Sequence, residues 1–160
     1  MKSSSYCRRC AKAGEGKVLS FDDFLAYNGG MKDSAEFVAH GFVRAINRQD
    51  ADALAGMMTE EHRFIDALGN AVAGREAMRK AWVGYFRMVP DYSIAVEETL
   101  LDGPVVVLLG VAQGTYTSDG QLRPENRWET PVALRALVEE GKVAEWRVYA
   151  DNEPMRRLMR

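Results

Sequence analysis

Residues 127–150, RWETPVALRALVEEGKVAEWRVYA, contain the pattern that decides the fold class. Apolar and polar side chains alternate in residues 127–138 and again in residues 143–150, and Glu140-Gly141 separates the two runs. Alternation with a period of two is typical of β-strands, and a break containing glycine is typical of a hairpin turn. The two apolar faces comprise Trp128, Thr130, Val132, Leu134, Ala136 and Val138, and Ala144, Trp146, Val148 and Ala150. We therefore expect an antiparallel hairpin with one face packed against the rest of the chain.

The preceding residues predict two more strands of the same sheet. Residues 92–100 and 105–116 are rich in apolar side chains and flank Asp102-Gly103, a dipeptide that favours a hairpin. A second turn signal, Ser118-Asp119-Gly120, lies between this pair and residues 127–138. The chain after Pro90 is thus expected to form four antiparallel strands joined by hairpins.

The chain before Pro90 is predicted to be mainly helical. Residues 34–46 and 75–89 place apolar side chains three to five positions apart, as an amphipathic helix requires. Asp50 can cap a short helix between them, and residues 62–66 alternate like a strand. Helices first and sheet last predict the α+β class, with a curved antiparallel sheet wrapped around about three helices.

Residues 1–30 are predicted to be a loosely ordered N-terminal extension of a domain formed by residues 31–160. Residues 1–17 are rich in Ser, Lys, Arg and Gly and have few side chains to bury. Cys7 and Cys10 form a Cys-x-x-Cys pair, but a structural zinc site needs about four ligands. A redox pair needs a strand before it and a helix after it, and neither is expected here. We therefore predict no metal and no cofactor.

Composition and charge exclude several classes of partner. The chain has 21 basic and 23 acidic residues, giving a net charge of -2. Nucleic acids and anionic membrane surfaces attract proteins with a concentrated positive field, so we expect neither as a partner. No apolar run approaches the roughly 20 residues of a membrane span, and residues 1–10 lack the apolar core of a secretory signal. These features predict a cytoplasmic protein.

Aromatic side chains gather on the predicted inner surfaces. The helix over residues 75–89 carries Trp82, Tyr85 and Phe86 along one stripe, facing the apolar sides of the last two strands. Aromatic rings bury much area but fill irregular space poorly. The pattern fits a solid core and a ligand pocket, and the sequence leaves both open. If a pocket is present, its walls are predicted to be Phe42, Phe64, Trp82, Tyr85, Phe86, Trp128 and Trp146.

In this order and spacing, three segments resemble the nuclear transport factor 2-like superfamily. They are residues 42–54 (FVRAINRQDADAL), 66–78 (DALGNAVAGREAM) and 141–151 (GKVAEWRVYAD). The superfamily includes ketosteroid isomerases, limonene epoxide hydrolases and SnoaL-like polyketide cyclases. The resemblance covers residues 36–159. It implies a cone of curved sheet around three helices, an internal pocket, and often a homodimer formed through the outer face of the sheet.

The resemblance to ketosteroid isomerases places Asp66 at the position of the general base. Those enzymes also need a tyrosine and a protonated carboxylic acid as donors in an oxyanion hole. Here Phe42 takes the tyrosine position, and Ala133 or Leu134 takes the acid position. None of these side chains can donate a hydrogen bond, and one lost donor costs about 3 kcal/mol of transition-state stabilisation. Ordinary ketosteroid isomerase activity is therefore not expected.

The other two enzyme classes differ in how well they fit. Limonene epoxide hydrolases need a charged residue two places after the tryptophan of the last strand, where this chain has Val148. The polyketide cyclases use a histidine and an aspartate near the end of the sheet. Asp151, followed by Met155 and Leu158, resembles that ending.

Three residues are candidates for acid–base chemistry, each with a structural alternative. Asp66 is the candidate base, since a carboxylate facing an apolar cavity has a raised pKa; alternatively it bonds the following turn. His62 lies on the same strand face, about 13 Å from Asp66 along the strand. It is a candidate auxiliary acid; alternatively it is a solvated histidine at the start of the strand. Asp151 is a second auxiliary acid or the cap of the C-terminal tail.

Two functions follow from these residues. The first is a small-molecule pocket protein that acts as a cofactor-free isomerase, cyclase or hydratase on an apolar carbonyl compound, with Asp66 as the base. The second is a non-catalytic ligand-binding or dimerisation module of the same fold. A small apolar molecule and a second copy of the chain are the expected partners.

Overall fold

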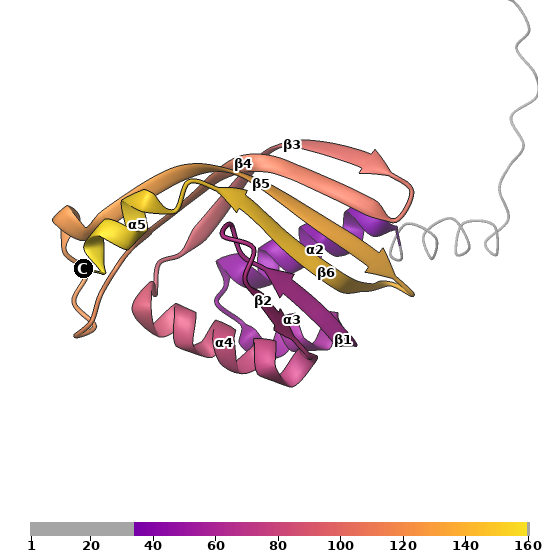
Figure 1. The fold of residues 1–160 in the computed structure, drawn as a ribbon, viewed down its shortest axis with the longest axis horizontal. Helices are drawn as coiled ribbons and strands as arrows, with labels where there is room; N and C mark the ends of the chain where they lie inside the picture. Colours follow the sequence, from indigo (N-terminus) through magenta and orange to yellow (C-terminus); the bar gives the residue numbers. More distant parts are fainter. Residues whose placement is uncertain (1–33, 160) are drawn as a thin grey trace, which may run out of the picture.

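Six strands form one curved sheet in the computed structural model, which describes residues 34–159 (Figure 1). The predicted extension over residues 1–30, including Cys7 and Cys10, lies outside the described residues. The strands are ordered β2-β1-β6-β5-β4-β3 across the sheet. In chain order the elements are α2 (Ala35–Asn47), α3 (Ala51–Gly56), β1 (Met58–Ile65), β2 (Ala71–Ala73), α4 (Arg75–Met88), β3 (Ser93–Asp102), β4 (Val105–Thr115), the short 3-10 turn η1 (Pro124–Asn126), β5 (Arg127–Glu139), β6 (Lys142–Ala150) and α5 (Glu153–Leu158).

The last four strands form the predicted antiparallel meander. β4 pairs with β5 from Val105↔Leu137 to Thr115↔Arg127, and β5 pairs with β6 across the Glu140-Gly141 turn. Every second residue of β5, from Trp128 to Val138, is buried. The α+β fold class is confirmed.

The first strand differs from the prediction of a purely antiparallel sheet, because β1 pairs with β6 in parallel. This pairing sets Phe64 beside Trp146 on the inner face. β1 also begins at Met58, four residues earlier than the alternating stretch indicated, and a three-residue strand, β2, pairs with its end. The sheet is therefore mixed. Through β1, the first half of the chain lies beside the last strand, β6.

The helices lie against the concave side of the sheet (Figure 1). Ser34 caps α2 by accepting a hydrogen bond from the Phe37 N–H at 3.2 Å. Asp50 caps α3 in the same way through the Ala53 N–H at 2.9 Å. α4 ends at Met88, just before Pro90, which disfavours helical backbone in the preceding residue. None of the helices described between residues 34 and 159 is long and apolar enough to cross a membrane.

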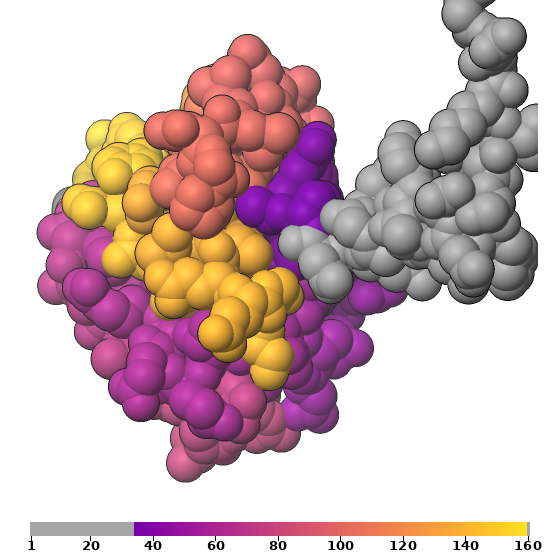
Figure 2. All heavy atoms as spheres, turned by 90° about the vertical axis from the view of Figure 1, so that its right-hand side faces the viewer, coloured from indigo at the N-terminus to yellow at the C-terminus, as the bar shows by residue number. Residues whose placement is uncertain are grey.

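One end of the molecule is closed by α2. Its N-terminal end lies beside the hairpins that join β3 to β4 and β5 to β6 (Figure 2). Deeper along the helix, Phe42 and Ile46 are fully buried and pack with Trp146, Leu108 and Leu134 from the sheet. This end of the cone is a solid core. The space that remains lies at the other end, between α4 and the last strands.

Candidate functional site

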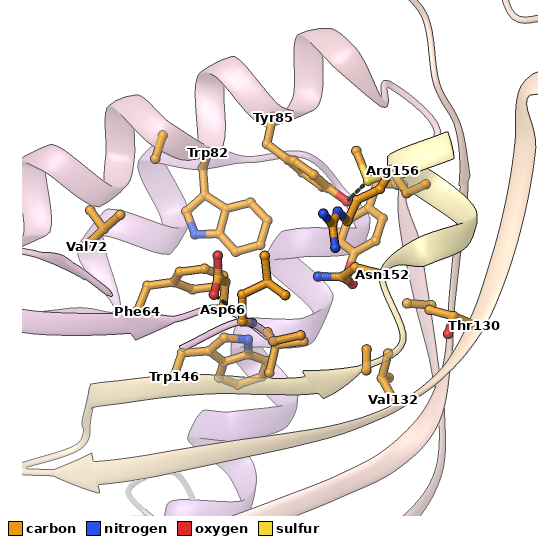
Figure 3. A pocket seen from close by; sticks show the side chains of 18 of the residues that line it. Phe64, Asp66, Val72, Trp82, Tyr85, Thr130, Val132, Trp146, Asn152 and Arg156 are labelled. Carbon is orange, nitrogen blue, oxygen red and sulfur yellow. Dashed lines mark hydrogen bonds between the residues drawn. The ribbon is translucent and has the colours of Figure 1, made fainter. Parts of the chain in front are cut away.

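A cavity of about 400 Å³ lies between α4, the inner face of the sheet and α5 (Figure 3). Most of its lining is apolar. The residues that line it are Phe64, Asp66, Ala67, Leu68, Val72, Met78, Ala81, Trp82, Tyr85, Tyr92, Ala112, Trp128, Thr130, Val132, Trp146, Val148, Ala150, Asn152, Met155, Arg156 and Met159. The cavity therefore draws on both halves of the chain, from β1 to the C-terminal helix.

Aromatic rings form a connected wall along one side of the cavity. Trp82 and Tyr85, one helical turn apart on α4, have ring centroids 5.9 Å apart in an edge-to-face arrangement. Tyr85 is also edge-to-face with Tyr92 at 5.0 Å, and Tyr92 lies 5.9 Å from Trp128. Both edge-to-face pairs have a geometry that aromatic rings prefer, so these contacts stabilise the wall.

The indole N–H groups of Trp82 and Trp128 have no hydrogen-bond partner among residues 34–159. Both side chains are buried, with 5% and 7% of their surface exposed. An unpaired buried donor costs about 1–3 kcal/mol. A core selected only for stability would pair both indole N–H groups. The two unpaired donors therefore indicate that this region is not optimised for stability alone.

Two of the seven predicted wall residues do not line the cavity. Phe42 is fully buried, 4.8 Å from the Trp146 ring, in the solid end of the cone. Phe86 stacks on the far side of Trp82 at 5.2 Å. Both lie one layer behind the lining and support residues that form it. Helical periodicity identifies a buried stripe but does not separate its first layer from its second.

Asp66 lines the cavity and at the same time closes the turn that follows β1. Its Oδ1 accepts hydrogen bonds from the backbone N–H of Leu68 at 2.9 Å and of Asn70 at 2.8 Å. Its Oδ2 accepts one from the side-chain amide of Asn70 at 2.8 Å. The turn interaction anticipated as the alternative role is present, and it occurs in a residue that also borders the cavity.

The electrostatic consequence differs from the sequence-based expectation. Burial alone would raise the pKa of the Asp66 carboxyl, but the hydrogen bonds from Asn70, Leu68 and Gly69 outweigh it and hold the pKa below its ordinary value of 3.8. Hydrogen bonds to a carboxylate favour the charged form. Asp66 is therefore ionised at neutral pH and is a weaker base than an unbonded carboxylate in an apolar pocket would be.

His62 occupies neither of the environments considered for it. The side chain is fully buried and is not among the residues that line the cavity. Its Nδ1 lies 2.8 Å from the Val143 carbonyl oxygen, which fixes Nδ1 as the donor, and its Nε2 has no partner among residues 34–159. Burial lowers the pKa of His62, although the bond to Val143 and the charge of Glu145 act in the opposite direction. The parallel pairing of β1 with β6 covers this residue, which a period-two pattern alone could not reveal.

Asp151 is exposed and also lies outside the cavity lining. Its Oδ1 accepts a hydrogen bond from the Glu153 N–H at 2.9 Å, and its carbonyl oxygen accepts one from the Thr130 hydroxyl at 3.0 Å. These contacts fix the start of α5. The three acid–base candidates are thus not assembled into one cluster, and only Asp66 faces the cavity.

The C-terminal helix and its flanking residues contribute lining that was not among the cavity walls predicted from the sequence. Asn152, Met155, Arg156 and Met159 close the side of the cavity opposite the β1 edge. The apolar spacing of Met155 and Leu158 was the available signal for a docked helix. No group of three or more His, Cys, Asp or Glu side chains within residues 34–159 is arranged to hold a metal ion.

A family model described as SnoaL-like domain matches residues 39–146. Among solved structures, a candidate SnoaL-like polyketide cyclase from Shewanella denitrificans OS-217 has a TM-score of 0.68 at 15% identity, over 78% of this chain and 96% of that one. IdmH from Streptomyces antibioticus, a candidate polyketide cyclase, has a TM-score of 0.65 at 19% identity, over 79% of this chain and 98% of its own.

An epoxide hydrolase of the LEH-like type from M. tuberculosis has a TM-score of 0.65 at 16% identity, over 78% of this chain and 87% of that one. No curated protein matches the chain. At these identities the structural similarities show the shared fold, and proteins with different reactions share it.

Proposed function

Because the chain belongs to the SnoaL-like domain family, we propose that its cavity binds a small, largely apolar molecule. The observation that carries this proposal is the aromatic-walled cavity of about 400 Å³. Sites for small organic ligands occupy roughly 300–1,000 Å³ and are lined mainly by apolar and aromatic side chains with few polar groups. A flat ring system can pack against the wall formed by Trp82, Tyr85 and Trp128.

The binding proposal is tested with N-phenyl-1-naphthylamine, an uncharged aromatic probe whose fluorescence rises in apolar surroundings. We expect saturable binding to the wild-type protein. Val148→Trp places an indole in the cavity from β6 and is expected to weaken binding by at least about tenfold, because the space is then filled.

Arg147→Trp is the control, since it introduces the same side chain at the neighbouring residue on the outer face of β6. It is expected to bind the probe like the wild type, and circular dichroism checks that both variants are folded. Equal binding by the wild type and Val148→Trp would contradict the proposal, since the probe would then be bound elsewhere.

A second candidate function is proton transfer within the same cavity, as in an isomerase, cyclase or hydratase. It is favoured by one observation: the ionised Asp66 carboxylate borders a largely apolar lining. Its Oδ2 accepts a single protein hydrogen bond among residues 34–159, which leaves a lone pair for a substrate C–H or O–H proton. Proton transfer between a carbon acid and a carboxylate needs no cofactor.

Asp66→Asn separates the two functions. The Asn Oδ1 can still accept the Leu68 and Asn70 N–H bonds, so the turn is retained while the base is removed. For a cyclic β,γ-unsaturated ketone, the test is isomerisation followed by absorbance at the wavelength of the conjugated product. Turnover lost in Asp66→Asn, with probe binding kept, supports catalysis. Turnover unchanged in the variant removes Asp66 as the base, and turnover absent from the wild type removes isomerisation of such ketones as the reaction.

We also propose that the outer face of the sheet joins two copies of the chain. Val107, Leu109 and Val111 point outward from β4, and Leu109 is aligned through Ala133 with Tyr149 on β6. Tyr149 is 48% exposed in the single chain. An apolar stripe across several strands is a common mark of a protein interface.

The cytoplasmic location of the protein remains a prediction from the sequence.

A further inference from the structure

The α5 side of the cavity contains a cation without an acidic partner. Arg156 lines the cavity and makes no ion pair with any carboxylate of residues 34–159. The neighbouring Arg157, which is not part of the lining, pairs with Glu153 at 3.2 Å. The two consecutive arginines therefore differ: one is neutralised on the surface, and the other borders the apolar space uncompensated.

Asn152 provides a second polar side chain beside Arg156 for which no hydrogen bond is found among residues 34–159. It occupies the N-cap position of α5, where an asparagine side chain normally accepts a hydrogen bond from the first turn of the helix. Here its side chain makes no capping bond, and Asp151 serves the Glu153 N–H instead. Figure 3 shows the Asn152 amide directed into the cavity. The residue is therefore freed from its usual role and presented to the bound molecule.

Tyr85 places a hydroxyl group in the same region from α4. Among residues 34–159 the hydroxyl donates only to the Met155 sulfur at 3.7 Å, a weak acceptor. Burial raises the pKa of Tyr85, so the hydroxyl stays protonated and can donate. In Figure 3 the Tyr85 hydroxyl, the Arg156 guanidinium and the Asn152 amide converge on one part of the cavity.

We propose that the molecule bound in the cavity carries an oxyanion such as a carboxylate, held by Arg156 with help from Asn152 and Tyr85. This inference rests on the proposed binding function and specifies its ligand class. All three groups can donate hydrogen bonds, and a guanidinium matches the geometry of a carboxylate. The ligand is thus an apolar ring body with one acidic end, and that end faces α5.

Asp66 fits this orientation. The two charged groups of the lining come from opposite ends of the domain sequence, Asp66 after β1 and Arg156 on α5. The Asp66 carboxylate would repel an oxyanion placed beside it. The donors of Asn70 and Leu68 are already used by that carboxylate, so they do not offset the repulsion. The charges therefore favour one direction of binding over the reverse.

The test uses two competitors of the same size and shape, naphthalene-2-carboxylate and naphthalene-2-carboxamide, each displacing N-phenyl-1-naphthylamine. The wild-type protein is expected to bind the carboxylate about tenfold more tightly than the carboxamide, since hydrogen bonds to charged groups are the stronger class. Arg156→Gln is expected to abolish this preference. Arg157→Gln changes a second exposed arginine, outside the cavity, and is expected to keep the preference.

The possible outcomes separate this inference from the binding proposal. If the neutral probe binds but the carboxylate has no advantage, or keeps its advantage in Arg156→Gln, the oxyanion site is wrong and the apolar cavity stands. If the neutral probe does not bind in the cavity of the wild type, the binding function fails and the ligand class fails with it. Thermal unfolding of each variant verifies the fold, and the exposed position of Arg156 makes a folding defect unexpected.

Discussion

Asn70 donates two hydrogen bonds to the carboxylate of Asp66, one from its backbone N–H to Oδ1 and one from its side-chain amide to Oδ2, both at 2.8 Å. The same carboxylate borders the cavity. The turn after β1 and the chemistry of the cavity therefore depend on one side chain. Weakening the hydrogen bonds of this turn would raise the basicity of Asp66.

Asn70→Ala tests this relationship. The variant removes the side-chain donor to Oδ2 but retains the backbone donor to Oδ1. Because hydrogen bonds to the charged form lower a carboxyl pKa, the pKa of Asp66 is expected to rise. The measurement is an NMR titration of the Asp66 side-chain carbonyl carbon. Asn152→Ala, which alters the cavity away from this turn, is the control and is expected to leave the Asp66 pKa unchanged.

The backbone of β3 approaches Gly110 of β4 closely. A Cβ at position 110 would overlap the carbonyl oxygen of Ala95, next to the register shift between Val96 and Glu98. Gly110→Ala is expected to destabilise the fold by about 3 kcal/mol, as an overpacked site does. For a protein of this size that lowers the melting temperature by roughly 6–12 °C.

Gly84→Ala is the matched control for that prediction. Gly84 lies on the exposed side of α4, and a Cβ there meets no atom within 4 Å. Alanine is favoured over glycine in a helix by about 1 kcal/mol, so this variant is expected to raise the melting temperature slightly. Differential scanning calorimetry measures both. A Gly110→Ala protein as stable as the wild type would mean that β3 is free to move away from β4.

The apolar outer stripe makes the oligomeric state sensitive to a single charge. Leu109→Arg places a guanidinium in the middle of the proposed interface, where burying an unpaired charge is strongly unfavourable. We expect the wild type to sediment at twice the mass of one chain and the variant at the mass of one chain. Leu101→Arg alters an exposed leucine aligned with inward-facing Val106, outside the stripe, and is expected to remain dimeric. A monomeric wild-type protein would contradict the interface.

Period-two and helical patterns were sufficient to predict α2, α4, β4 and β5, because each buries one face. β3 is mostly exposed, and the Asp102-Gly103 turn signal located it beside β4. These patterns were not sufficient for the parallel pairing of β1, which depends on a contact between distant segments, Phe64 with Trp146. The sequence also did not decide between the two roles of Asp66, because a single carboxylate can border a cavity and accept the hydrogen bonds of a turn at the same time. Arg156 was missed because α5 is short and buries no residue, so it leaves no strong pattern.

His62 gives the protein a predicted loss of stability on the acid side of neutrality. Its pKa in the folded chain is lower than the ordinary value of 6.5, so the unfolded chain binds the proton more readily. The free energy of unfolding is then expected to fall as the pH drops below 6.5, with a slope of up to about 1.4 kcal/mol per pH unit. The physical cause is the fully buried ring, whose Nε2 would become a charged donor with no acceptor among residues 34–159.

His62→Gln isolates this effect, because glutamine can still donate to the Val143 carbonyl but does not titrate. Urea unfolding at pH 7 and pH 5 is expected to show a smaller difference for the variant than for the wild type. Asp66 does not interfere, since its ordinary pKa is 3.8 and its folded-state pKa is lower, so its own contribution is lost only in more acidic solution. His40, the other histidine, is present in both proteins and cancels in the comparison. Equal pH dependence in the two proteins would contradict this prediction. It would show that His62 can be protonated in the folded chain, because water reaches this part of β1 more readily than the burial of His62 indicates.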